Sequence, residues 1–364
     1  MTGRNQILSS ARNRVQVANR VLALLMLAAV VALALAPLWA GRAEMRLLME
    51  VLSYLALAQM WNLLAGYTGL VSVGQQAFVG LGGYLFFALA MFTGMPVLLA
   101  IPAAALATAV LSIPTGWIAF RLHGAYFAIG TWVIAEVYRL IAAQFSALGG
   151  GSGISLPVDL VRAMADTRAG REQLTYYIAF AIAVLSVAGV WVLLRSRWGL
   201  ALTAIRDSQV AAESIGVNTR RAKYVVYVLT AFMTGLTGAF IFLQKLRITP
   251  DAAFSVNDWT AFVIFIVIIG GIGTIEGPII GVIVFFTLRE IAADWGTWYL
   301  IMMGAIAIAV MVVDKRGIWG ALKSRFGLTV FPVDRRLDVE TRGASGASQQ
   351  PNQTHMKTGL QHAE

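Results

Sequence analysis

One stretch of this chain, residues 199–218, combines charged, small and helix-capping residues in a way that suits the docking of another protein. Asp207 or Ser208 can cap a short helix that runs through Ser214, and Gly216 can supply the left-handed residue that ends it. Cations lie within and beside the stretch, at Arg195, Arg197, Arg206, Arg220, Arg221 and Lys223. Because cations between apolar segments mark a cytoplasmic loop, we interpret this stretch as a docking element for a cytoplasmic partner.

Several enzymatic chemistries are excluded by residues that the sequence lacks. No Gly-Lys dipeptide occurs, so a Walker A phosphate loop is absent and the chain cannot hydrolyse ATP by itself. His123, His355 and His362 lack metal-ligand spacing, and with no cysteine there is neither a thiolate ligand nor a cysteine nucleophile. No combination of nucleophile and base can be assembled, which argues against a membrane-embedded enzyme.

Composition indicates an all-α, polytopic membrane protein. The 364 residues are 59% hydrophobic and 13% charged, and the mean hydropathy is +0.74. Soluble domains carry about 25% charged residues. The net charge of +10 lies mostly in loops and tails, where it suits an anionic membrane surface, so we do not expect nucleic-acid binding.

Apolar runs predict about ten membrane-spanning helices. They cover residues 21–40, 46–65, 77–93, 97–120, 124–145, 174–194, 224–244, 259–273, 277–293 and 297–313. If the N-terminus is cytoplasmic, successive loops between the ten spans alternate between the two sides of the membrane. Most of the 28 Lys and Arg residues then lie inside, in agreement with the positive-inside rule. The connections 146–173 and 245–258 then lie outside, and the Gly-rich run 149–153 is expected to be flexible.

The predicted organisation is a membrane domain between two tails. Residues 1–20 form a basic cytoplasmic N-terminal tail, residues 21–313 form the membrane domain, and residues 314–364 form a cytoplasmic C-terminal tail. From about residue 338 the composition changes to Gly, Ser, Gln, Asn and Thr, which predicts disorder.

Two segments crowd glycine, proline and polar residues between apolar runs, at 66–83 and 270–281. Irregular backbone at membrane depth persists only inside protein or beside a watery cavity. Paired interruptions of this kind point to a translocation pathway and are compatible with an inverted repeat. The alternative is that the glycines only allow close helix packing. The candidate pathway residues are Gly66, Thr68, Gly69, Ser72, Gln75, Gln76, Gly271, Gly273, Glu276 and Pro278.

Glu136 and Arg139 lie three residues apart in the fifth predicted span and can pair on one helix face. Charges inside a membrane helix are usually paired and face the bundle interior. We therefore predict a structural ion pair.

Six motifs, in this order, resemble the inner-membrane permeases of branched-chain amino acid ABC importers, the LivM type. They lie within residues 46–321, at 66–75, 124–129, 149–154, 204–216, 270–278 and 316–320. The resemblance implies a half-pore in the bacterial inner membrane that pairs with a second homologous permease. It also implies two ATP-binding subunits inside, a periplasmic solute-binding protein outside, and no cofactor in this chain, since ATP and Mg belong to the partner subunits.

In such importers the cytoplasmic loop, here within residues 195–223, is a coupling helix that sits in a groove of the ATPase. By this resemblance the coupling residues are Arg206, Asp207, Ala211, Ala212, Glu213 and Gly216. A plain membrane-surface helix is the alternative.

The substrate is open among branched-chain amino acids, related amino acids, amides and urea, because family members handle all of them. An ion-coupled secondary transporter is the competing class. It is favoured by the broken helices but weakened by the few carboxylates suited to proton coupling.

Overall fold

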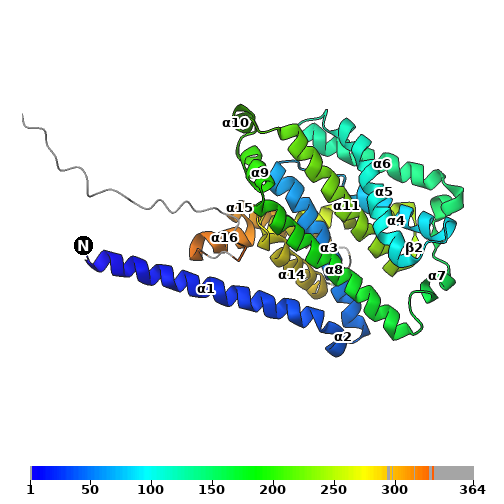
Figure 1. Ribbon diagram of the computed structural model, residues 1–364, viewed down its shortest axis with the longest axis horizontal. Helices are drawn as coiled ribbons and strands as arrows, with labels where there is room; N and C mark the ends of the chain where they lie inside the picture. Colours follow the sequence, from blue (N-terminus) through cyan, green and yellow to red (C-terminus); the bar gives the residue numbers. More distant parts are fainter. Residues whose placement is uncertain (1, 293–295, 297, 315, 328–329, 332–364) are drawn as a thin grey trace, which may run out of the picture. The chain divides into compact units, whose positions relative to one another are not determined.

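A computed structural model describes residues 2–292, 296, 298–314, 316–327 and 330–331, and these are mainly helical, as predicted (Figure 1). The first half contains α1 (Thr2–Ala34), α2 (Ala36–Trp39), α3 (Arg42–Thr68), α4 (Gln75–Phe92), α5 (Val97–Ala119), α6 (Ala125–Gln144) and α7 (Val158–Arg162). The second half contains α8 (Arg168–Arg195), α9 (Arg197–Asp207), α10 (Gln209–Ser214), α11 (Thr219–Lys245), α12 (Pro250–Ala253), a π-helical turn (Asn257–Ala261), α13 (Phe262–Gly270), α14 (Glu276–Ile291), α15 (Trp298–Val313) and α16 (Gly317–Phe326).

Each predicted span falls on a helix. Within the described part of the chain, eight helical stretches are long and apolar enough to cross a membrane, namely Val17–Ala34, α3, α4, α5, α6, α8, α11 and Pro250–Gly270. The last two predicted spans coincide with α14 and α15, which have 16 residues each. At 1.5 Å per residue such a helix is about 24 Å long, somewhat less than a bilayer core.

The two predicted tails differ in what the structure describes. Residues 2–20 are continuous with the first span as part of α1. The apolar stretch of α1 buries none of its residues within the chain. At the other end, α16 lies in the predicted C-terminal tail, and residues 338–364 are outside the described residues.

Helix α3 is the central element of the bundle. Its second half is buried almost without interruption, from Leu52 to Thr68 with one partly buried position. It contacts α8, α9, α11, α13 and α14, while α11 also packs on α4 and α5. The α4–α11 contact is close because both sides carry glycine: a Cβ on Gly82 would lie 2.1 Å from the carbonyl oxygen of Gly235.

The two connections predicted to lie on one side of the membrane pair with each other. β1 (Ile154–Ser155) and β2 (Arg247–Ile248) form a short antiparallel ladder, preceded by 3₁₀ turns at Ser146–Leu148 and Gly150–Ser152. The Gly-rich run thus forms turns that lead into the paired strands, and its expected flexibility stays a prediction. Gly153 has φ +71°, and a Cβ there would lie 2.1 Å from the carbonyl oxygen of Ile248. Glycine is thus required where the run packs against β2.

Candidate functional site

The first interrupted segment runs from Gly69 to Gly74 and turns back along α3. Gly69, with φ +72°, ends α3 in the left-handed conformation. At the start of α4, the Nε2 of Gln75 donates to the carbonyl of Leu57 (2.9 Å). Leu57 precedes the end of α3 by eleven residues, or about 16 Å of helix. Helix α4 therefore begins beside the middle of α3, with irregular backbone at membrane depth.

Neighbouring side chains satisfy the polar backbone of this first break. The indole of Trp61 donates to the carbonyl of Ser72 (2.8 Å), and the Oγ1 of Thr131 accepts from the amide of Val73 (3.1 Å). The hydroxyl of Ser72 accepts from the amide of Gly74 (3.2 Å). The irregular backbone is thus buried in protein, which is one of the two situations in which such backbone persists in a membrane.

The second break, Gly271–Ile275, is held by two amide side chains of α3. Asn62 donates to the carbonyl of Thr274 and accepts from the amide of Gly273, both at 2.8 Å. One turn earlier, the Nε2 of Gln59 donates to the carbonyl of Ile275 (2.7 Å). Sequence analysis missed Gln59 and Asn62. Their signal was two amides spaced i, i+3 inside an apolar run, on the same helix face.

Glycine allows the backbones to meet at the second break. A Cβ on Gly66 would lie 2.6 Å from the amide nitrogen of Gly273. On the other side, a Cβ on Gly317 would lie 2.6 Å from the Cα of Gly271, which brings the start of α16 against the break. The close-packing explanation therefore applies to these glycines.

Most of the predicted pathway residues are buried within the chain. Gly66, Thr68, Ser72, Gln75, Gln76, Gly271, Glu276 and Pro278 are buried, Gly273 is half-buried and Gly69 is exposed. The side-chain oxygen of Gln76 accepts a hydrogen bond from Thr260. The Oε1 of Glu276 accepts from the amides of Val330 (3.1 Å) and Phe331 (2.9 Å). In this conformation these residues hold backbone together, and their role in a pathway stays a prediction.

The predicted docking element consists of two helices, α9 and α10, which we call the docking loop (residues 197–214). Ser208 is the cap of α10: its Oγ accepts from the amide of Ala211 (3.2 Å). Asp207 instead pairs with Arg206 (3.2 Å). Gly216 has φ +87° and follows the helix in the left-handed conformation, as predicted. The loop is thus bounded at both ends by local capping.

The two alanines of α10 differ in exposure. Ala211 is exposed, whereas only 1% of the surface of Ala212 is accessible. Ala212 therefore packs inside the chain, and its small size lets α10 approach α9 and α11. Of these two predicted coupling residues, only Ala211 is exposed for contact with a partner, and the coupling role of both stays a prediction.

Glu213 has a partner within the chain. Its Oε1 accepts hydrogen bonds from Thr219 (2.6 Å) and Gln209 (3.0 Å). These bonds, with a smaller contribution from Lys223, lower the pKa of Glu213 below its usual value. The carboxylate is therefore ionised at neutral pH.

The docking loop adjoins the second break. Helix α9 packs on α3 and α8, and its residues Leu202 and Ile205 are buried. The Nη1 of Arg206 lies 3.4 Å from the position that a Cβ on Gly273 would occupy. Arg206 therefore lies beside the second break.

The predicted ion pair of α6 is present and has a third member. The Nε of Arg139 donates to both carboxylate oxygens of Glu136 (2.9 and 3.0 Å), and its Nη1 donates to Asp251 (2.7 Å). Since Asp251 lies on α12, the group joins α6 to the connection after α11. Sequence spacing indicated the pair within α6 but carried no signal for Asp251.

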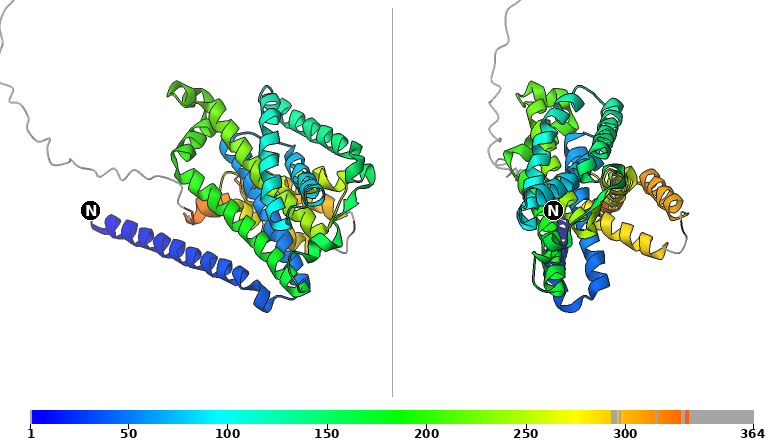
Figure 2. Two further views of the ribbon diagram at one scale, coloured as in Figure 1. Left: turned by 45° about the vertical axis from the view of Figure 1, so that its right-hand side comes forward. Right: turned by 90° about the vertical axis from the view of Figure 1, so that its right-hand side faces the viewer.

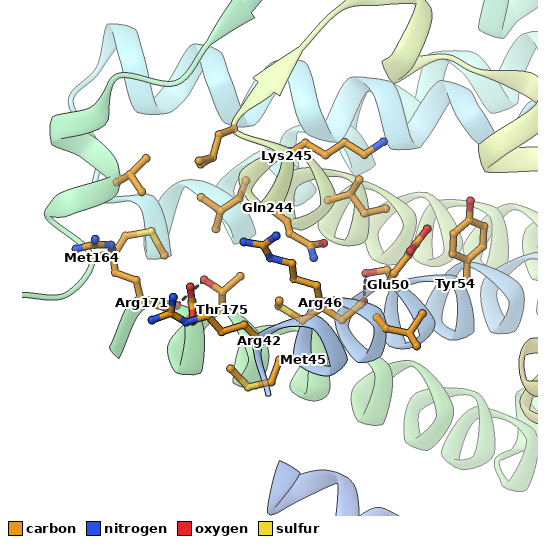
Figure 3. A pocket seen from close by; sticks show the side chains of 18 of the residues that line it. Arg42, Met45, Arg46, Glu50, Tyr54, Met164, Arg171, Thr175, Gln244 and Lys245 are labelled. Carbon is orange, nitrogen blue, oxygen red and sulfur yellow. Dashed lines mark hydrogen bonds and ion pairs between the residues drawn. The ribbon is translucent and has the colours of Figure 1, made fainter. Parts of the chain in front are cut away.

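A cavity of about 1100 Å³ opens at the other end of the bundle. Its walls come from the starts of α3 and α8, from α7, from the end of α11 and from the π-helical turn (Figure 3). Figures 1 and 2 show the docking loop and the start of α3 at opposite ends of α8. No residue predicted for the pathway or for coupling lines this cavity.

These features define a class of protein: a mainly helical, polytopic membrane protein with a capped docking loop beside two buried helix breaks. The chain belongs to the family of branched-chain amino acid transport system permease components, whose model matches residues 44–313.

Among known proteins, the chain is similar to the high-affinity branched-chain amino acid transport system permease protein LivM of Escherichia coli K12. The two are 26% identical over 317 residues, which cover 81% of this chain and 74% of the relative. The LivM protein of Salmonella typhimurium is also 26% identical, over 78% of this chain and 71% of that protein. A shorter match, 29% identical over 41% of the chain and 42% of the relative, links it to the fructose import permease protein FrcC of Rhizobium meliloti. No solved structure matches the chain significantly.

Proposed function

We propose that this chain is one half of the pore of an ATP-driven importer for branched-chain amino acids. The pore is completed by a second homologous permease, two ATP-binding subunits supply the energy from the cytoplasm, and a periplasmic binding protein delivers the solute. Beside the family membership, the proposal rests on one observation: the capped docking loop presents the exposed Ala211 while its Arg206 reaches the second break.

We propose that contacts between helices carry the closure of the ATP-binding subunits to the membrane helices. Closure of the ATP-binding subunits displaces α10, and α9 moves with it because Ala212 locks the two helices together. Helix α9 then presses on α3 and on Gly273. The breaks are suited to rearrangement, since side chains such as Asn62 hold them in place of a regular helical ladder.

The orientation follows from charge. The docking loop and the start of α11 carry a concentration of cations, which supports an orientation with this end of the bundle and both termini in the cytoplasm of a bacterial cell. The paired strands β1 and β2 then lie outside, where a solute-binding protein can reach them.

The proposed substrate class rests on the two LivM relatives, whose names state branched-chain amino acid transport. Fructose, taken from the name of the FrcC relative, and urea are the matched competitors to test.

Uptake of radiolabelled leucine tests the proposal. The measurement uses membranes that contain this chain together with the subunits encoded beside its gene, with ATP and with an uncoupler. We expect uptake to require ATP, to survive the uncoupler, and to be competed by isoleucine or valine in preference to glutamate, urea or fructose. Uptake by this chain alone, lost on adding the uncoupler, would instead identify a secondary transporter.

A further inference from the structure

The cavity at the end of the bundle away from the docking loop carries more cations than its carboxylates neutralise. Its lining includes the cations Arg42, Arg46, Arg162, Arg168, Arg171, Lys245 and Arg289 and the carboxylates Glu50, Glu172 and Asp258. The proposed topology places this end outside the cell, where positive charge is otherwise disfavoured. A concentration of cations there suits the binding of an anionic group.

Only some of the charged side chains that line the cavity form ion pairs within the chain. Glu172 lies 3.4 Å from both Arg42 and Arg168, and Glu50 is held by Arg289 through two bonds of 2.7 and 2.8 Å. Among the described residues, Arg46, Arg162 and Lys245 form no ion pair with a carboxylate, and Asp258 forms none with a cation. Both kinds of charge thus remain for a ligand.

The cations come from several walls of the cavity. Arg46 extends from α3 toward Gln244 near the end of α11 (Figure 3). On the same end of α11, the ammonium group of Lys245 lies 4.7 Å from the ring centre of Trp259. Apolar groups complete the wall, among them Met45, Met49, Tyr54, Leu243 and Phe262. Apolar walls with a few convergent charges are typical of small-molecule sites.

We propose that this cavity binds the zwitterion of an α-amino acid with an apolar side chain, at the outer mouth of the pathway. Arg46 receives the carboxylate, Asp258 receives the ammonium group, and the methionine and aromatic wall receives the side chain. The mixed charge favours a zwitterion over an anionic phospholipid such as phosphatidylglycerol, whose headgroup has no cation for Asp258. The inference rests on the proposed function, of which it names the outer solute site.

The absence of cysteine from the chain permits a direct test. Thr175, half-buried in the cavity wall, is replaced by cysteine in the purified complex with its partner subunits, and the rate of modification by a neutral thiol reagent is read from the mass of this chain. We expect leucine to slow modification about threefold when it occupies two thirds of the sites. Leucine methyl ester, which lacks the carboxylate, should protect far less.

Matched variants inside and outside the cavity lining show whether protection by leucine depends on the residues of the cavity. Arg46→Gln should abolish the protection of Thr175→Cys by leucine. Arg247→Gln, which removes an exposed cation of β2 outside the cavity lining, should leave the protection intact. Modification of Ser155→Cys, at an exposed position on β1 outside the lining, should not respond to leucine.

The inference is overturned if leucine leaves the modification rate of Thr175→Cys unchanged, or if its methyl ester protects equally. Protection by added anionic phospholipid but not by leucine would assign the cavity to lipid and also overturn it. Failure of the proposed function is a separate result, since it is read from ATP-dependent uptake by the unmodified complex.

Discussion

At the scale of single residues, Asn62 shows how a broken helix is stabilised inside a membrane protein. A single amide side chain supplies a donor to Thr274 and an acceptor to Gly273, as a continuing backbone ladder would. Each unsatisfied buried polar group costs about 1–3 kcal/mol in mutational series. Gln59 and Asn62 are therefore the residues that allow an irregular segment to lie beside the buried half of α3.

Gly66→Ala tests the close approach of α3 to the second break. The added methyl group would lie 2.6 Å from the amide nitrogen of Gly273, so backbone must shift. We expect a loss of about 1–3 kcal/mol in stability, measured as a lower midpoint of thermal unfolding in detergent. Gly189→Ala on α8 is the matched control, because no neighbouring atom lies within 4 Å of its added Cβ. Equal midpoints for the two variants would contradict the packing described here.

The sequence predicts residue roles where partners are local. The cap at Ser208, the left-handed Gly216 and the pair Glu136–Arg139 all involve residues within a few positions of one another. The partners of Gln59 and Asn62 are more than 200 residues away, and Asp251 is 112 residues from Arg139. Periodicity and capping rules carry no information on such contacts.

Among the elements, the docking loop combines an exposed helix with a buried connection to the bundle. Helix α10 is short and exposed on one side, but buried Ala212 ties it to α9, and Ile205 ties α9 to the bundle. Hydrophobic length predicted the spanning helices well. Which side of so short a helix faces inward depends on how α9 folds back, so the burial of Ala212 could not be predicted.

Arg206→Gln should weaken coupling while leaving the fold intact. The exposed pair with Asp207 contributes about 0–1 kcal/mol, so the unfolding midpoint should barely change. The glutamine side chain is shorter than that of arginine and extends less far toward the second break. We therefore expect solute-stimulated ATP hydrolysis by the reconstituted complex to fall about fivefold or more. Arg220→Gln, an exposed cation in the first turn of α11, is the control. Equal stimulation in both variants would remove Arg206 from the coupling route.

In the whole molecule, the two ends of the bundle are proposed to lie on opposite sides of the membrane. Single cysteines at Val210 in α10 and Ser155 in β1 test this, since both positions are exposed and the chain has no native cysteine. We expect an impermeant thiol reagent to label Ser155→Cys in intact cells whose outer membrane has been opened. Val210→Cys should be labelled only after the inner membrane is permeabilised. Labelling of both from one side would refute the topology.

The proposal that ATP-binding subunits drive this chain through the docking loop is tested most directly by one measurement. It is solute-stimulated ATP hydrolysis by the reconstituted complex carrying Ala211→Trp. Ala211 is exposed on the docking loop, so a bulky side chain there should block contact with an ATP-binding subunit without disturbing the core. Ala169→Trp, at an exposed alanine at the opposite end of α8, is the matched control. We expect the solute to stimulate ATP hydrolysis in the Ala169→Trp complex but not in the Ala211→Trp complex. The midpoints of thermal unfolding of the two variants should be equal. Full stimulation in Ala211→Trp would show that the partner subunits do not drive this chain through the docking loop.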